Sequence, residues 1–343
     1  MKGNRLIVNA FAATTPGAEL TPYSYEPDEL GPLEVDVDVT HCGICHTDLT
    51  VIDNDWGGQT PAVAGHEVAG IVTAVGSLVD TELLQVGQRV AVGGVAGSCM
   101  NCEYCLTGRQ QLCFNRDSIA FRGDRGGFAS SVRAGDWRFA YPLPDAIDLA
   151  HAGPLLCAGV TAFAPFIRHN IKPTDHIAIV GIGGLGHLAI QFARAWGCEV
   201  TAISTSPDKR EQAVELGAHH FITSRGTDEL AAAVNTFDFI VSTVTGAIPW
   251  DDYLAALKPQ GTLIVVGVPE TAMQISPMSL VFSEKTISGG LVASRNETLQ
   301  MLNFAARTGV RPVVELFDMS DINRAITRVR SGEVRYRAVL AAR

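Results

Sequence analysis

The chain has 343 residues, of which 47% are hydrophobic and 18% are charged, and its formal net charge is −10. This length exceeds that of one ordinary hydrophobic core and predicts two domains. The composition is typical of a packed globular protein rather than a disordered one, and the negative charge argues against nucleic acid or an anionic membrane as partner, because both are bound by basic patches.

The first segments are typical of short β-strands. Lys2 and Arg5 precede an apolar run in a loose likeness to a signal peptide, but the run is short and Asn9 interrupts it, so a first strand is the better interpretation. Residues 33–40 alternate apolar and acidic side chains and predict a half-buried strand. Later apolar stretches are broken by Gly, His or Gln, so we expect no membrane span. Eight cysteines in a chain of intracellular character favour metal sites over disulfides.

Three separate segments carry the residue types of a catalytic zinc site. Cys42 and Cys45 have the spacing of a redox pair, but nothing upstream supplies the thioredoxin-like unit that such a pair requires, so one of them is better interpreted as a zinc ligand. His66 and Glu67 lie at the entrance of a predicted strand, and Cys157 lies on a predicted helix joining the two domains. One His and two Cys leave a fourth zinc position open. Glu67 could orient the metal, bind it transiently, or be a structural carboxylate.

A polar loop between predicted strands contains four more cysteines: Cys99, Cys102, Cys105 and Cys113. Four thiolates at this spacing predict a closed tetrahedral zinc site. Such a site is structural, because it orders a loop that has little core of its own. An iron–sulfur cluster and four free thiols are the less favoured alternatives.

The second half of the chain is organised around a glycine-rich turn. Residues 177–180 predict a buried strand and residues 187–196 a helix. The turn between them contains Gly181, Gly183, Gly184, Leu185 and Gly186. This is the setting of a dinucleotide fingerprint, in which glycines permit a tight turn and close approach of a pyrophosphate to the helix start. Strands and helices then alternate to residue 288, which predicts a doubly wound parallel sheet.

The end of the second strand of this sheet bears on the choice of dinucleotide. Where an NAD enzyme carries an acidic residue, this chain has Ser204, Thr205 and Ser206, followed by Lys209 and Arg210. Hydroxyls donate to phosphate oxygens and cations neutralise them, so the segment favours NADP over NAD. The three hydroxyl residues could instead be a helix N-cap.

Together these residues resemble the zinc-containing medium-chain alcohol dehydrogenases, in particular the cinnamyl alcohol dehydrogenase group and its bacterial NADPH-dependent aldehyde reductases. The resemblance spans nearly the whole chain and rests on the four-cysteine loop and on residues 42–48, 65–67, 153–161 and 181–186. It implies an α/β fold: a GroES-like β-rich catalytic domain over residues 1–157, to which 296–343 return, and a Rossmann NADP-binding domain over 158–295.

The resemblance also assigns roles to single residues. It implies that the catalytic zinc is held by Cys45, His66 and Cys157. Thr47 passes a proton to or from the substrate oxygen, and His46 lies near the cofactor pyrophosphate. Further cofactor contacts are implied for Thr161, Thr243, Gly267, Gly290 and Leu291. Thr50 stands where many relatives have a histidine that ends the proton relay, and Trp56 either walls the substrate pocket or lies in the core.

The implied activity is zinc-dependent, reversible reduction of aldehydes to primary alcohols, with a hydride from NADPH. Two zinc ions per chain, a homodimer and a cytoplasmic location are further expectations. An NAD-linked polyol or secondary-alcohol dehydrogenase is one alternative, against which the segment 204–210 argues. A zinc- and nucleotide-binding relative without catalysis is another, against which the intact set of Cys45, Thr47, His66 and Cys157 argues.

Overall fold

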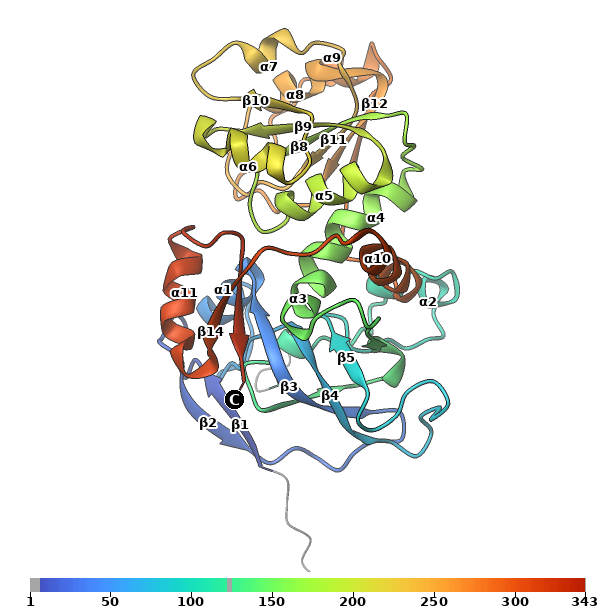
Figure 1. Cartoon of the computed structure of the whole chain (residues 1–343), viewed down its shortest axis with the longest axis vertical. Coiled ribbons are helices and arrows are strands. Elements are labelled where there is room, and N and C mark those ends of the chain that lie inside the picture. Colours follow the sequence, from blue (N-terminus) through green and yellow to red (C-terminus); the bar gives the residue numbers. More distant parts are fainter. Residues whose placement is uncertain (1–6, 122–124, 343) are drawn as a thin grey trace, which may run out of the picture. The chain divides into compact units, whose positions relative to one another are not determined.

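The structure is a computed structural model that describes residues 7–121 and 125–342. It divides into two compact units. Unit 1 contains Met1–Cys157, Ala293–Arg307 and Arg311–Arg343, and unit 2 contains Ala158–Val292 and Thr308–Val310. The chain therefore leaves unit 1, builds unit 2 and returns to unit 1. In Figure 1 both the blue and the red ends of the colour scale lie in unit 1.

Unit 1 is built on β-strands from both halves of the chain. Its strands are β1 (Val8–Ala12), β2 (Thr21–Tyr25), β3 (Val35–Ile44), β4 (Glu67–Val75), β5 (Arg89–Val92), β6 (Ser131–Ala134), β7 (Ala140–Pro142), β14 (Val314–Asp318) and β15 (Arg337–Ala341). The large sheet has the order β14-β15-β3-β4-β5-β7, with β6 paired to β3, while β1 and β2 form a separate ribbon. Val37, Val68 and Leu340 are fully buried in one core, so the last strand shares the core of the early ones.

The helices of unit 1 are short apart from one. They are α1 (His46–Asp53), α2 (Glu103–Leu106), α3 (Leu149–Pro154), α10 (Arg295–Thr308) and α11 (Ile322–Arg330). In Figure 1, α11 lies beside β14 and α3 lies over β3 and β4. No helix is predicted from the sequence over α1, which begins directly after Cys45.

Unit 2 contains a six-stranded sheet in which every pair of neighbours is parallel. Its strands are β8 (His176–Val180), β9 (Glu199–Ser204), β10 (His220–Thr223), β11 (Phe237–Ser242), β12 (Leu257–Val265) and β13 (Thr286–Gly289). The order β10-β9-β8-β11-β12-β13 is that of a doubly wound dinucleotide-binding sheet. The predicted fold class, a Rossmann sheet with a β-rich partner, is confirmed.

Helices connect the strands of unit 2. They are α4 (Val160–Arg168), α5 (Gly186–Trp196), α6 (Arg210–Glu215), α7 (Glu229–Ala232), α8 (Trp250–Ala256) and α9 (Pro277–Val281). Ala178 and Val180 pack with Trp250 in one core cluster. Successive strand residues point to opposite faces, so Ile177 and Ile179, also buried, face the other side of the sheet.

Two apolar segments of unit 1, residues 126–132 and 86–92, have the pattern of a strand but form one over only part of their length. In the first segment the strand begins only at Ser131, because the N–H of Gly126 donates to Val63 and that of Phe128 to Ala64, and residues 128–130 bond to residues 9–11. In the second segment the strand begins at Arg89, because Gly87 has a φ of +87° and forms a turn.

The continuous helix Leu149–Arg168 corrects another expectation. It has 20 residues, and an 18-residue window within it has a mean hydropathy of 1.4, so by length and composition alone it could span a membrane, although its interrupted apolar sequence predicts no such stretch. Its glycines, histidine and prolines do not end the helix. Of that 18-residue window 83% is buried, as in the core helix of a globular protein.

Candidate active site

Four side chains of unit 1 converge in its interior. One ligand atom from each of Cys45, His66, Glu67 and Cys157 lies within 4.8 Å of the others. The Cys45 and Cys157 sulfurs are 3.8 Å apart, and His66 Nε2 is 3.2 Å from Cys157 Sγ. Sulfurs bound to one tetrahedral zinc at about 2.3 Å are themselves about 3.8 Å apart. The spacing of the two thiols therefore fits a zinc ion.

Local structure places each of these groups. Cys45 directly follows β3 and is the N-cap of α1, while His66 directly precedes β4 and Glu67 begins it. Because β3 and β4 are antiparallel neighbours, with Gly43 opposite Glu67, the two segments meet at one end of the pair. Cys157 lies in a π-helical turn, Leu155–Gly159, a widened turn that is frequent at functional sites.

Asp48, to which the sequence analysis assigns no role, supports the cluster through contacts with His66 and with the backbone of two segments. Its Oδ1 lies 2.8 Å from His66 Nδ1 and accepts from the backbone N–H of Gly65, and its Oδ2 accepts from the backbone N–H of Cys45 at 2.8 Å. The contact leaves Nε2 of His66 as the nitrogen that faces the thiols. A carboxylate in this position fixes the ring and tautomer of a metal-binding histidine.

Arg337 is the second residue that the sequence analysis misses. Its guanidinium pairs with Glu67 Oε1, and both side chains are buried. The other carboxylate oxygen, Oε2, is buried and accepts no hydrogen bond within the described residues. A buried, unsatisfied acceptor beside two thiols is a further observation that fits a cation in this cluster. The only sequence signal for Arg337 is a lone cation that begins an apolar final strand.

The ionisation of the cluster shows how closely its members interact. The hydrogen bond with Cys157 is the largest effect on Cys45 and, with Arg337 and His66, holds the pKa of that thiol well below its ordinary value despite burial. The same contact, together with burial, raises the pKa of Cys157 well above its ordinary value. Burial opposes the charge on His66, but Asp48 outweighs it and the pKa of His66 is raised. The cluster thus stabilises a thiolate and suits a divalent cation.

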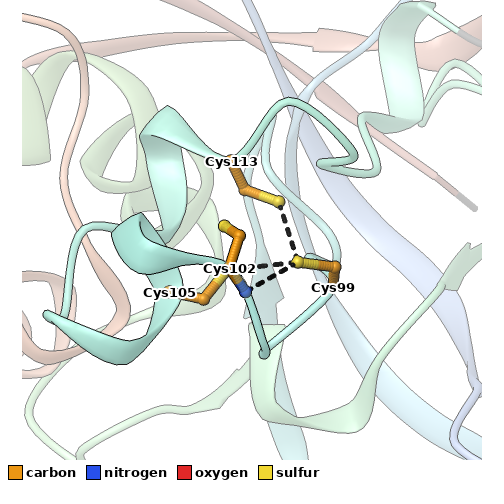
Figure 2. Close-up of side chains that lie close together, drawn as sticks. All are labelled: Cys99, Cys102, Cys105 and Cys113. Atoms are coloured by element: carbon orange, nitrogen blue, oxygen red, sulfur yellow. Dashed lines mark hydrogen bonds between the residues drawn. The ribbon is translucent and has the colours of Figure 1, made fainter.

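A second cluster lies in the loop around α2. Figure 2 shows the side chains of Cys99, Cys102, Cys105 and Cys113 brought together, and their sulfurs lie within 4.8 Å of one another. Cys99 Sγ is 3.9 Å from Cys105 Sγ and 3.5 Å from Cys113 Sγ. Backbone N–H groups of Asn101 and Cys102 lower the pKa of Cys99 to about 6. Four sulfurs at this spacing fit a tetrahedral zinc with no open position.

The glycine-rich turn of unit 2 has the geometry expected of a phosphate-binding turn. Gly181 has a φ of +90°, which favours glycine. A Cβ on Gly186 would collide with the carbonyl oxygen of Gly181, so helix and strand approach closely there, whereas a Cβ on Gly183 would meet open space. Thr243 donates to the carbonyls of Val180 and Gly181, at 2.9 and 3.2 Å, and fixes the turn.

The two cations that follow β9, Lys209 and Arg210, contact different groups. Lys209 Nζ donates to the carbonyl of Ile182 at 2.8 Å, which places its charge beside the glycine turn. Arg210 instead lies over the Phe221 ring, 4.7 Å from its centroid, and 3.7 Å from Glu229. Ser204 is buried, and its hydroxyl accepts from the backbone N–H of Ser206.

The remaining predicted site residues are placed as follows. In unit 1, His46 is exposed and Thr47 is half-buried, both in α1. The hydroxyl of Thr50 donates to the carbonyl of His46. Trp56 is 59% exposed and stacks on Phe121. Trp56 is therefore not a core residue. In unit 2, Thr161 is buried in α4 and Thr205 is exposed. Gly267 packs against the backbone of Thr243 and Val244. Gly184 and Leu185 lie in the glycine turn, and Gly290 and Leu291 follow β13.

Comparison with known proteins identifies the family. Residues 31–145 match the alcohol dehydrogenase GroES-like domain, and residues 184–307 match the zinc-binding dehydrogenase family. An aldehyde reductase of Synechocystis is 43% identical over 336 residues, which cover 98% of this chain and 99% of that protein. The chain belongs to the zinc-containing medium-chain alcohol dehydrogenases.

Solved structures agree with this assignment. A cinnamyl alcohol dehydrogenase from Sorghum bicolor superimposes with a TM-score of 0.93, at 37% identity, over 98% of each chain. A cinnamyl alcohol dehydrogenase from Helicobacter pylori, complexed with NADP(H), gives a TM-score of 0.89 at 27% identity, over 98% of this chain and 99% of that one. The predicted resemblance to the cinnamyl alcohol dehydrogenase group is confirmed.

Proposed function

We propose that this member of the alcohol dehydrogenase family is a zinc-dependent enzyme that reduces aldehydes to primary alcohols, reversibly, with NADPH. The proposal rests on the convergence of three candidate zinc ligands, Cys45, His66 and Cys157. Asp48 contacts the ring of His66 and orients it. The names of the similar proteins, an aldehyde reductase and cinnamyl alcohol dehydrogenases, support the substrate class.

Cys45, His66 and Cys157 would hold the catalytic zinc, and Glu67 lies within reach as a transient fourth ligand. When bound, zinc supplies a Lewis acid that polarises a carbonyl group. Thr47, two residues after Cys45 in α1, exchanges a proton with the substrate oxygen.

The four cysteines around α2 would hold a second, structural zinc, so that each chain carries two. Thr50 and Trp56, both on or just after α1, are assigned to the substrate pocket. Residues 1–157 and 296–343 form the catalytic domain in this proposal, and residues 158–295 the cofactor domain.

NADP(H) is assigned to the carboxyl ends of the strands of unit 2. Its pyrophosphate is assigned to the turn of Gly181, Gly183, Gly184, Leu185 and Gly186, and its 2′-phosphate to Ser204, Thr205, Ser206, Lys209 and Arg210. His46, Thr161, Thr243, Gly267, Gly290 and Leu291 are assigned to further contacts. The position of the Lys209 amine beside Ile182 supports the phosphate assignment, because it brings a cation to the same edge of the sheet.

A homodimer and a cytoplasmic location are part of the same proposal. Strand β13 is an edge of the parallel sheet, and Val281 and Phe282, a few residues before it in the chain, are 71% and 78% exposed. An unpaired edge with exposed apolar side chains favours association with a second copy. All eight cysteines are free thiols, which is typical of a reducing compartment.

The test is the initial rate of aldehyde reduction with NADPH and with NADH at equal concentration. We expect a medium-chain aldehyde to be reduced and NADPH to be preferred. Cys45→Ser should abolish the rate, whereas Cys198→Ser, at a buried thiol of unit 2, should retain it. A preference for NADH would overturn the cofactor assignment, and an unchanged rate in Cys45→Ser would overturn the active site.

A further inference from the structure

A third group of metal-binding side chains lies in unit 2, apart from both cysteine clusters. His176, Glu199 and His220 are the first residues of β8, β9 and β10. These strands are parallel neighbours, so their first residues meet at the amino edge of the sheet. The glycine turn at Gly181 follows the carboxyl end of β8, so the group lies at the edge opposite the assigned cofactor site.

The strand register puts the three side chains on one face of the sheet. His176 is opposite Glu199, and His220 is opposite Thr201. Glu199 and Thr201 are two residues apart and therefore point to the same side. One ligand atom from each of the three residues lies within 4.8 Å of the other two. His220 Nε2 is 2.8 Å from Glu199 Oε1, and His176 Nδ1 is 3.9 Å from Glu199 Oε2.

The ring of His176 is oriented by its surroundings. Its Nε2 is 2.7 Å from the hydroxyl oxygen of Thr201, and its ring packs edge-on against Phe237, with centroids 4.9 Å apart. The nitrogen that remains, Nδ1, faces Glu199. A hydrogen bond to the second ring nitrogen is the arrangement that positions histidine ligands in metal sites.

The group is open to solvent, and the cation next to it is already paired. The side chains of His176, Glu199 and His220 are 15%, 54% and 55% exposed. The nearby Lys258 Nζ donates to Asp238 Oδ2 at 2.8 Å, which offsets its repulsion of a bound metal. His219 is not a candidate ligand, because its Nδ1 accepts from the backbone N–H of Val200 and its Nε2 contacts Arg194.

We propose that His176, Glu199 and His220 form a third metal site, which binds a divalent transition-metal cation such as Zn²⁺ or Ni²⁺. Two imidazoles and one carboxylate suit these borderline cations, and three protein ligands leave the remaining positions to water. The bound ion would join the starts of three adjacent strands, and would therefore stabilise unit 2 against unfolding.

Nickel is the probe for the test. The untagged full-length protein is first freed of weakly bound zinc by brief dialysis against a chelator and is then dialysed against Ni²⁺, and the zinc and nickel contents per chain are measured together. We expect the wild type to retain one more nickel per chain than His220→Asn and Glu199→Gln, with an unchanged zinc content. Both substituted side chains are more than half exposed, so these variants keep the fold. Thr201→Val should weaken nickel binding about 10-fold, because it removes the contact that orients His176.

His169→Asn is the matched control, because His169 is a half-buried histidine of unit 2 outside the group. It should bind nickel as the wild type does, and all variants should melt at the wild-type temperature when nickel is absent. Equal nickel contents in the wild type, His220→Asn and Glu199→Gln would overturn the proposal. Nickel gained only in exchange for zinc would also overturn it, because the metal would then occupy the cysteine clusters.

Discussion

At the scale of single residues, Asp48 connects the two chain segments that form the candidate catalytic zinc site. It accepts from the backbone of Cys45 on one segment and from the backbone of Gly65 on the other, and it contacts the ring of His66. One fully buried carboxylate therefore sets both the separation of the segments and the direction in which His66 points.

Replacing this carboxylate by an amide should weaken metal binding. We expect Asp48→Asn to lower zinc affinity at this site by about 10- to 100-fold, as is usual when the partner of a metal-binding histidine is lost. The measurement is zinc retained per chain after dialysis against increasing chelator, with the aldehyde reduction rate followed in parallel. Asp38→Asn, on an exposed position of β3, is the control. Wild-type retention of zinc by Asp48→Asn would contradict the role given to Asp48.

The two cations after β9 should differ in their effect on cofactor choice. Lys209 lies beside the glycine turn, while Arg210 is engaged with Phe221 and Glu229. A hydrogen bond to a charged group contributes about 1.5–3 kcal/mol. We therefore expect Lys209→Ala to raise the KM for NADPH by about 10- to 100-fold, with little effect on the KM for NADH. Arg210→Ala should have the smaller effect, and equal effects on both cofactors would count against a 2′-phosphate contact.

The candidate metal ligands could be predicted from the sequence, but the residues that support them could not. Cysteine and histidine are recognisable because few other residue types serve as zinc ligands, and their spacing adds information. Asp48 and Arg337 act through contacts between segments that lie 18 and 270 positions apart. No local pattern records such a pairing, so it becomes visible only in the folded chain.

At the scale of elements, the four-cysteine loop contains little regular structure. Between Cys99 and Cys113 there are only α2, with four residues, and a 3-10 turn, Gln110–Leu112. Leu106 and Phe114 are 73% and 86% exposed, so the loop has few apolar contacts of its own. Its order therefore depends on what the cysteines bind.

Removing one of these cysteines should loosen the loop without unfolding the sheet. We expect Cys102→Ser to carry one zinc fewer per chain than the wild type and to be cleaved faster by protease between residues 99 and 113. Zinc analysis and limited proteolysis followed by mass spectrometry measure both effects. Cys198→Ser should match the wild type in both assays, and a Cys102→Ser variant with full zinc content would contradict the structural site.

Elements with a strong local pattern were predictable, and those shaped by distant contacts were not. The strands and helices of unit 2 combine apolar runs with glycine boundaries, such as Gly217 with its φ of +110°, and their prediction is confirmed. Helix α1 begins at a cysteine N-cap, a residue type that does not indicate a helix start. The segment 126–130 has the pattern of a strand, but its backbone bonds to two distant segments, residues 63–65 and residues 9–11.

At the scale of the whole molecule, the last strand is tied to the candidate active site. Strand β15 pairs with β3, and its first residue, Arg337, is the partner of Glu67. Both side chains are buried, at 5% and 0% exposure, so removing one charge leaves the other without compensation.

Loss of this arginine should therefore be costly. We expect Arg337→Met to lower the free energy of unfolding by about 3–5 kcal/mol, the usual cost of breaking a buried ion pair. Urea unfolding of the protein measures the change. The double variant Glu67→Gln, Arg337→Met should recover part of the loss, while Arg324→Ala, which breaks an exposed pair with Asp321, should change little. An unchanged free energy of unfolding in Arg337→Met would show that the ion pair with Glu67 does not contribute to stability.

The return of the chain to unit 1 also orders events during protein synthesis. Strands β3 and β4 leave the ribosome early, yet β3 lacks its β15 neighbour until residues 337–341 have been translated. Nearly all of unit 2 is one continuous segment, Ala158–Val292, so it can fold on the nascent chain while the older part is still incomplete. Unit 1 is therefore completed only after unit 2 has been translated, although most of the strands of unit 1 are made first.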